Sequence, residues 1–381
     1  MNGSLRIGHL FGIPIYLHWT FLIVIPLFAW IIGSQIALTA TMIAGLFGTE
    51  ITMTLFLQGL APYILGAAIS LGLFAGVLVH ELAHSVVARA MGLKINSITL
   101  LIFGGVASME EGLPDPKVEL PMALVGPLAS LGVAIVSVAL TYAPAALVEA
   151  GKLSPEVGGV LIYLFGYLAL LNFVLFIFNL LPAFPMGGGR VLRAWLAKKM
   201  PLHEATKIAA DIGRGFAVFF GIFGFLIFSP ILIIIAFFIY IGANQEATAV
   251  RYSFLLRDVS VGDVMSSPVT TVPPEMPVTE VVKMMYDTKH LGFPVMERGG
   301  LVGMITLGDV HTASTIDREA MQVRDLMTKD LVVLPPDAPL TEAMRIMSQT
   351  GIGRIPVVEE GEVVGIVTRT DILTTLEIKE A

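Results

Sequence analysis

The sequence predicts two parts of different fold class: an all-α polytopic membrane domain with about six transmembrane helices and a small re-entrant β or loop element, and a cytosolic α/β domain pair. The chain is 55% hydrophobic and only 14% charged, whereas soluble domains carry about 25% charged residues. Its long apolar stretches lie before residue 250, and the remainder contains one unit twice. The predicted domains are therefore 1–250, a linker at 251–257, and 258–381, divided into repeats 258–318 and 319–381.

Apolar windows of about 20 residues mark segments that can cross a bilayer. Six such windows lie at approximately 15–33, 62–89, 118–143, 157–180, 208–228 and 230–247. Residues 36–60 are also apolar, but Glu50 and the glycines and threonines make them a weaker span. We expect an interfacial or external helical hairpin there.

Basic residues predict the orientation of these spans, because Lys and Arg accumulate in cytoplasmic loops. In a six-span arrangement the opposite loops, 34–61 and 144–156, contain only Lys152 as a basic residue. The other side has Arg6, Arg89, Lys94, Lys117, Arg190, Arg193, Lys198, Lys199, Arg251 and Arg257. We therefore expect a multi-pass protein of the plasma membrane with both termini and the repeats in the cytoplasm.

Net charge and cysteine content exclude two classes of site. The net charge of −7 gives no basic footprint for nucleic acid. The absence of cysteine rules out disulfides, thiolate metal ligands and a thiol nucleophile.

The sequence HELAH at 80–84 follows a stretch without charge from Ala61 to Val79. His80 and His84 are one helical turn apart, so both imidazoles project from one helix face and can grip one zinc ion. Glu81 lies beside them, where a carboxylate can accept a proton from a zinc-bound water. Burying such groups in an apolar span is costly unless they are paired or metal-bound, which argues against ordinary core residues. The pattern predicts hydrolysis of peptide bonds in the membrane.

Two stretches of the membrane half do not look helical. Residues 94–113 alternate polar and apolar and then turn at Gly104-Gly105, which is typical of short strands or a re-entrant loop. They are either a plain linker or an edge strand onto which an unwound substrate adds by backbone pairing. Residues 179–190 hold two prolines and three consecutive glycines, which cannot continue a helix. We expect this second stretch to face the HELAH helix across a polar pocket.

These motifs, together with GPLAS at 126–130, resemble those of the site-2 proteases, a family of intramembrane zinc metalloproteases of archaeal and bacterial type. The resemblance covers residues 1 to about 250. It implies zinc as cofactor, His80 and His84 as ligands, Glu81 as general base and acid, and membrane-spanning helices that must unwind as substrates. Asn179 matches the family's asparagine that helps hold the substrate carbonyl.

Gly187 departs from this family pattern, which has an aspartate there as the third zinc ligand. Glycine cannot ligate a metal, and catalytic zinc sites generally use three protein ligands plus water. Three interpretations remain open: an engineered knockout of an active protease, a natural pseudoprotease, or a site that another residue such as His18 completes. The other carboxylates near these motifs have different expected roles or lie on other segments; they are Glu81, Glu110, Glu111, Asp115 and Asp211.

The tail at 258–377 is an internal repeat with a constant offset of 62 residues. The matched residues include Asp263 and Asp325, Met265 and Met327, Pro294 and Pro356, Gly303 and Gly365, and Asp309 and Asp371. No insertion is needed, so the tail is a true duplication, with each unit expected to run strand, helix, strand, strand, helix.

This duplication resembles a tandem pair of CBS domains, whose members commonly bind adenine nucleotides (ATP, ADP or AMP) between the repeats. Thr306 with Asp309, and Thr368 with Asp371, match the family's ribose-contacting pattern. The alternative is that each pair simply caps a helix. Candidates for holding a phosphate are Arg354, Arg369 and His290.

The resemblance to CBS pairs implies a homodimer and regulation of the membrane half by the nucleotide. Two other functions compete: a CBS-regulated transporter, and a catalytically dead adaptor that senses nucleotides. Against transport, the membrane half lacks the internal repeat expected of many transporters.

Overall fold

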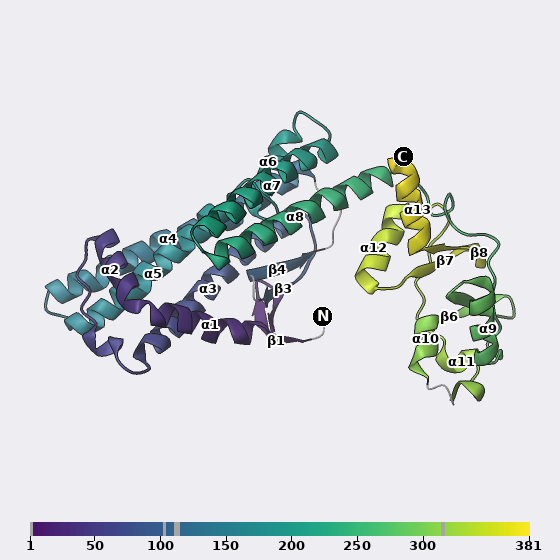
Figure 1. Cartoon of the computed structure of the whole chain (residues 1–381), viewed down its shortest axis with the longest axis horizontal. Helices are drawn as coiled ribbons and strands as arrows, with labels where there is room; N and C mark the ends of the chain where they lie inside the picture. The colour runs from purple at the N-terminus through teal and green to yellow at the C-terminus, as the bar shows by residue number, and fades with distance from the viewer. Residues whose placement is uncertain (1–2, 102–103, 110–114, 314–316) are drawn as a thin grey trace. The chain divides into compact units, whose positions relative to one another are not determined.

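The computed structural model describes residues 3–101, 104–109, 115–313 and 317–381. The chain divides into two compact units, Met1–Val250 and Arg251–Ala381. Figure 1 labels most of their helices and strands.

A four-stranded sheet in the first unit combines strands from before and after the helix that carries HELAH. Its strands are β1 Ser4–Leu10, β2 Ile13–His18, β3 Ile95–Leu101 and β4 Gly104–Met109. They lie in the order β1-β2-β3-β4, with β2 and β3 parallel and the other pairs antiparallel, so β4 is an edge strand. The strands predicted within 94–113 are therefore confirmed, although Glu110 and Glu111 lie outside the described residues.

The start of the span predicted at 15–33 is wrong, because its first residues belong to β2. Ile13 and Ile15 are buried while Pro14 between them is less so, and this alternation has the period of a strand. A window that counts only apolar residues cannot detect that period.

The helices of the first unit extend beyond several of the predicted windows. They are α1 Phe21–Ser34, α2 Ile36–Phe47, the 3-10 turn η1 Thr54–Leu57, α3 Ala61–Ala90, α4 Pro116–Glu149, α5 Pro155–Asn179, α6 Gly187–Leu196, α7 Leu202–Leu226 and α8 Pro230–Leu255. Among the described residues, α3, α4, α5, α7 and α8 are long and apolar enough to cross a bilayer. The pair α1 and α2, bent by 73°, makes a sixth span if it counts as one.

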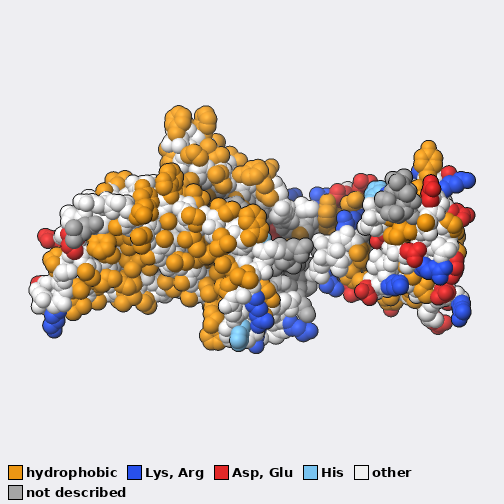
Figure 2. Space-filling view, turned by 90° about the horizontal axis from the view of Figure 1, so that it is seen from below, with side chains coloured by type: hydrophobic (Ala, Val, Ile, Leu, Met, Phe, Trp, Pro, Cys, Tyr) orange, Lys and Arg blue, Asp and Glu red, His pale blue; other side chains and the backbone are white. Residues whose placement is uncertain are grey.

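The surface of this unit fits a membrane environment. Figure 2 shows hydrophobic side chains over most of its visible face, and large apolar residues such as Phe225, Phe228 and Phe237 are more than half exposed. Residues 36–60 contain α2 and η1 instead of the predicted helical hairpin, because α2 continues α1 after the bend at Gln35.

The second unit consists of two hairpins with flanking helices. The first repeat contains α9 Val278–Thr288, β5 Gly292–Glu297, β6 Gly300–Thr306 and α10 Leu307–Thr312. After the turn η2 Asp317–Glu319, the second contains α11 Val323–Leu326, α12 Leu340–Thr350, β7 Arg354–Glu359, β8 Glu362–Thr368 and α13 Arg369–Glu380. The hairpins have the same register and the same irregularity, at Val295/Met296 and at Val357/Val358.

The two repeats interlock through their first segments. Ser266 of the first repeat pairs with Ile366 in β8, and the equivalent Thr328 of the second pairs with Met304 in β6. Leu256, just after α8, is fully buried in the core of the second repeat. The end of α8 and Leu256, which lie within the predicted linker 251–257, thus contribute to the fold of this unit.

Candidate active site and ligand cleft

Helix α3 brings His80 and His84 together as their spacing predicts. Their Nε2 atoms are 3.1 Å apart, and His80 is buried. The Nδ1 atom of His84 donates to the carbonyl oxygen of Met122 at 2.6 Å, and the Nδ1 atom of His80 is 2.9 Å from the hydroxyl of Ser130. Because these partners hold both rings, the two Nε2 atoms converge, and when neither carries a proton both present a lone pair to one cation.

Helix α4 forms the wall opposite these imidazoles. Met122, Gly126 and Ser130 are four residues apart, so they share one face of the helix. A Cβ atom at Gly126 would overlap Nε2 of His84 and lie 2.7 Å from Nε2 of His80. Only glycine therefore leaves room beside the ring nitrogens. Gly126 and Ser130 belong to the GPLAS motif, but no role was predicted for them, although their spacing of four was the available signal.

Strand β4 passes directly over Glu81. A Cβ atom at Gly105 would overlap Cγ of Glu81 and lie 3.1 Å from its Cδ and 3.4 Å from its Oε1. Strand β4, at the edge of the sheet, therefore lies next to the side chain of Glu81.

The segment at 179–190 packs on the same part of α4. A Cβ atom at Gly187 would lie 3.0 Å from the carbonyl oxygen of Ala123 and 3.7 Å from Cγ of Pro127, the neighbours of the residues that contact the histidines. Arg190 lies one turn further on in α6. Asn179 differs from the expectation, since its amide donates to the carbonyl of Leu175, in its own helix, at 2.9 Å.

The donor set is short of what a catalytic zinc site needs. In the described part of the chain, no group of three or more His, Cys, Asp or Glu side chains is placed to hold a metal. His18 lies 2.9 Å from the hydroxyl of Thr20, Asp115 caps α4, and Asp211 pairs with Arg214. Two imidazole nitrogens therefore face each other without a third ligand from the described residues, and this pair does not fit a three-ligand zinc.

A second buried polar cluster joins three helices of this unit. Arg193 in α6 forms ion pairs with Glu119 in α4 and, at 2.6 Å, with Glu246 in α8. Arg193 and Glu119 are 2% and 3% exposed, and the guanidinium also lies 5.0 Å from the ring centroid of Phe184. Burial lowers the pKa of Arg193, but the two carboxylates outweigh it and the pKa is raised. This cluster is fully partnered and links α4 to α6.

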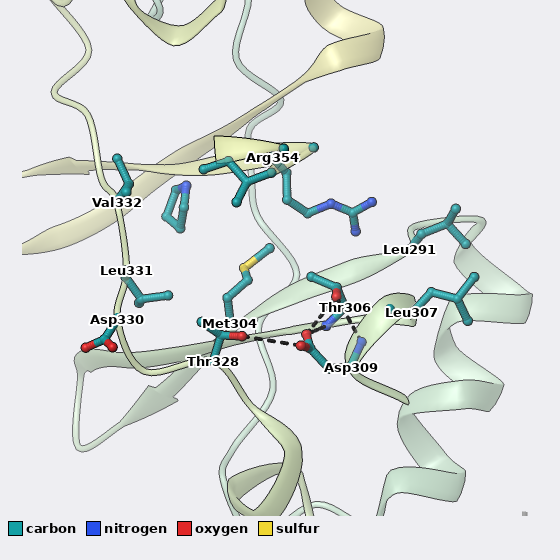
Figure 3. Close-up of a pocket in the computed structure, with 15 residues that line it drawn as sticks. Leu291, Met304, Thr306, Leu307, Asp309, Thr328, Asp330, Leu331, Val332 and Arg354 are labelled. Atoms are coloured by element: carbon teal, nitrogen blue, oxygen red, sulfur yellow. Dashed lines mark hydrogen bonds between the residues drawn. The ribbon is translucent and has the colours of Figure 1, made fainter. Parts of the chain in front are cut away.

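The second unit contains a cavity of about 400 Å³ between its repeats. Thr306 and Asp309 lie on one side and Arg354 on the other, as Figure 3 shows. The Thr306 hydroxyl donates to the Asp309 carboxylate at 2.6 Å, and the hydroxyl of Thr328 donates to its other oxygen at 3.3 Å. Leucine, methionine, valine and proline side chains complete the lining.

Both Thr-x-x-Asp pairs cap helices, as the alternative prediction states. Thr306 with Asp309 forms a capping box at α10, and Thr368 with Asp371 forms the same box at α13. Only the first pair is among the residues that line the 400 Å³ cavity. The ribose-contacting roles of all four residues remain predictions.

The three candidate phosphate-binding residues differ in their surroundings. Arg354 lines the cavity, whereas Arg369 donates to the carbonyl oxygens of Met347 and Gly351 at 3.1 and 2.9 Å. His290 is exposed, with its ring centroid 6.5 Å from that of Phe293. Burial lowers the pKa of Arg354.

The apolar helices and the paired histidines are typical of a membrane-type metallopeptidase domain, which is joined to a tandem α/β repeat with a cavity between its units. Comparisons with known proteins agree: residues 68–220 match the model of peptidase family M50, and residues 261–315 and 323–378 each match that of the CBS domain. A zinc metalloprotease of Methanocaldococcus jannaschii is 37% identical over 381 residues, which cover 100% of this chain and 98% of that protein. The Rip3 protein of Mycobacterium tuberculosis is 30% identical, with 99% and 94% covered.

Among solved structures, the site-2 protease from Methanocaldococcus jannaschii is 36% identical and covers 64% of this chain and 95% of its own, with a TM-score of 0.39. The sequence matches over the whole length show the family. This chain belongs to the site-2 proteases, the M50 zinc metalloproteases, of the kind that carry tandem CBS domains.

Proposed function

We propose that this chain is an intramembrane zinc metalloprotease by descent whose hydrolytic step is impaired at Gly187 and whose tail binds an adenine nucleotide. The paired histidines support descent from a zinc metalloprotease. Their Nδ1 atoms are anchored, their Nε2 atoms converge, and Gly126 clears the space beside them. Gly187, at the start of α6, packs against the same stretch of α4 and supplies no ligand. A natural pseudoprotease or membrane adaptor would have the same geometry.

The proposed substrate is a membrane-spanning helix that unwinds locally. Strand β4 is an edge strand, so its free backbone groups can pair with an extended peptide. Such a peptide would lie beside Glu81, because Gly105 in β4 contacts that side chain. The role of Glu81 is to accept a proton during hydrolysis and return it to the leaving amine. The Asn179 amide would have to leave the Leu175 carbonyl before it could steady the substrate carbonyl.

The substitution Gly187→Asp tests the proposed impairment. It raises the donor set to three, the number that catalytic zinc sites use. The space is tight, since a Cβ atom there lies 3.0 and 3.2 Å from two carbonyl oxygens, so the segment must shift by a few tenths of an ångström. We expect about one zinc per chain, measured by elemental analysis, and cleavage of a helical membrane substrate in proteoliposomes.

Gly187→Asn is the matched control, because it has nearly the same shape without the carboxylate. It should bind little zinc and cleave nothing. If folded Gly187→Asp protein also stays metal-free and inert, the impaired-protease proposal is wrong. If the unsubstituted chain binds zinc stoichiometrically and cleaves, another residue completes the site. Transport of a solute by metal-free protein in sealed vesicles would instead favour the transporter.

The nucleotide proposal rests on the cavity between the repeats. Its volume suits a small ligand, it has apolar walls for a purine, and the carboxylate of Asp309 is available to ribose hydroxyls. Ligand binding that favours one arrangement of the repeats would shift its population and so regulate the membrane half. Calorimetric titration with ATP, ADP and AMP tests binding; heats indistinguishable from dilution would remove the proposal.

We further propose a homodimer through the CBS domains, which light scattering tests. We also propose that the tail is cytoplasmic, which protease protection in oriented vesicles tests.

A further inference from the structure

The duplication places two Thr-x-x-Asp pairs at equivalent positions, but one residue pair makes the surroundings of the two different. Arg354 begins β7 and Gly292 begins β5, and these positions are equivalent at the offset of 62. They also touch each other, because a Cβ atom at Gly292 would overlap the Arg354 guanidinium and lie 3.1 Å from its Cδ. A large side chain at both positions would collide. The contact therefore permits a guanidinium at position 354, beside the Thr306–Asp309 pair. It excludes a second one at position 292, the equivalent position for the Thr368–Asp371 pair.

The guanidinium of Arg354 carries a charge that the fold does not neutralise among the described residues. Within this part of the chain it forms no hydrogen bond or ion pair, and it is only partly exposed to solvent. Figure 3 shows the guanidinium extending over the side of the cavity where Thr306 and Leu307 lie. A half-buried charge without a counter-charge is unfavourable unless an anion completes it. The cavity places that anion next to the Thr306–Asp309 pair.

Two of the cations around the equivalent position, Arg369 and Lys289, are engaged elsewhere. Arg369, equivalent to Leu307 in the lining, is bonded to two carbonyl oxygens. The ammonium of Lys289 lies 4.2 Å from the ring centroid of Tyr286. Gly292 stands where the first cleft has Arg354. The Thr368–Asp371 pair thus has the sugar-binding pattern without the guanidinium.

On the basis of the proposed nucleotide function, we infer that each chain binds one nucleotide, in the Thr306–Asp309 cleft. Arg354 selects ligands that carry a phosphate. Asp309 receives the ribose hydroxyls and the apolar walls receive the base. Adenosine, which has no phosphate, binds the same cleft weakly. The Thr368–Asp371 pair serves only to cap α13.

The first test compares AMP with adenosine on the full-length protein in nanodiscs by calorimetry. We expect one AMP per chain and binding about 10- to 100-fold tighter than that of adenosine, the usual gain from hydrogen bonds to a charged group. Arg354→Met, which keeps the length of the side chain, should lower AMP affinity to that of adenosine and leave adenosine affinity unchanged. An equal loss for both ligands, or no loss, would overturn the role of Arg354.

The duplication supplies the control for the carboxylates. Asp309→Asn and Asp371→Asn each weaken the same capping box, so their effects on thermal stability should be similar. Only Asp309→Asn should weaken AMP binding, again by about 10-fold or more. Two AMP molecules per chain, or an equal loss in Asp371→Asn, would overturn the single-cleft inference while leaving nucleotide binding intact. No AMP binding to any form would instead remove the proposed nucleotide function.

Discussion

The membrane half contains two buried polar clusters that differ in how they are completed. Glu119, Arg193 and Glu246 satisfy one another across α4, α6 and α8. The Nδ1 atoms of His80 and His84 are hydrogen-bonded to Ser130 and Met122. Among the described side chains, their Nε2 atoms contact only one another. In a buried cluster that is closed on itself each charge depends on its partners, whereas converging donors without a counterpart form a candidate site. The clusters share α4, so this helix sets the geometry of both.

The largest effect is expected from opening the closed cluster. Arg193→Met would leave Glu119, which is 3% exposed, without its counter-charge. Breaking a buried pair in this way costs about 3–5 kcal/mol of unfolding free energy. Asp211→Asn is the control in the same unit, because its ion pair with Arg214 is largely exposed and should be worth about 0–1 kcal/mol. Both variants are unfolded with denaturant in the same detergent. Equal losses of unfolding free energy would show that burial of the ion pair does not decide how much it contributes.

The open cluster is most sensitive at Gly126. In the Gly187→Asp background, Gly126→Ala places a methyl group against both Nε2 atoms. We expect zinc affinity to fall by about 100-fold or more, the upper end of what disturbing a ligand's surroundings costs. Gly132→Ala, on the same helix with nothing within 4 Å of its Cβ position, should leave zinc content unchanged. Competition with a calibrated chelator measures both, and stoichiometric zinc in the Gly126 variant would contradict the role of this wall in keeping space for the metal.

Ser130 should have a smaller effect, since it orients His80 without occupying the metal position. In the same background, Ser130→Ala removes the partner of His80 Nδ1 and should weaken zinc binding about 10- to 100-fold. Ser137→Ala, a buried serine further along α4, is the matched control. If both variants bind zinc equally well, the Ser130 contact does not orient the ring.

The sequence was sufficient for features that depend on local spacing. The four-residue separation of His80 and His84 predicted their convergence, and the constant offset predicted two matching hairpins. Contacts between distant segments were not predictable in the same way. Gly126 faces the histidines, and Gly105 contacts Glu81, only because α4 and β4 pack on α3. Likewise, β2 resembled the start of a span because its apolar residues fall within a hydrophobic window, although they pair with β1 just before it and with β3, about 80 residues away in the chain.

The smallest effect is expected at Asp263, a fully exposed carboxylate at the start of the first repeat. Hydrogen bonds from the hydroxyl and then the backbone N–H of Ser260 lower the pKa of Asp263. Because the folded-state pKa is below the unfolded one, the stabilisation is present at neutral pH and is lost as the pH falls through the folded-state pKa. Asp263→Asn should therefore lower the melting temperature of the tandem unit slightly at pH 7 and make no difference in strong acid.

Asp325 is the natural comparison, because it occupies the equivalent position but accepts from the backbone N–H of Gln322, at 2.9 Å, where no hydroxyl group is available. Asp325→Asn should consequently cost less at pH 7 than Asp263→Asn. Melting curves of the two full-length variants, recorded from pH 7 to strong acid, measure this difference. A penalty for Asp263→Asn that grows as the solution is acidified would contradict the assigned sign, since a carboxylate that is stabilised in its charged form can only lose its advantage on protonation.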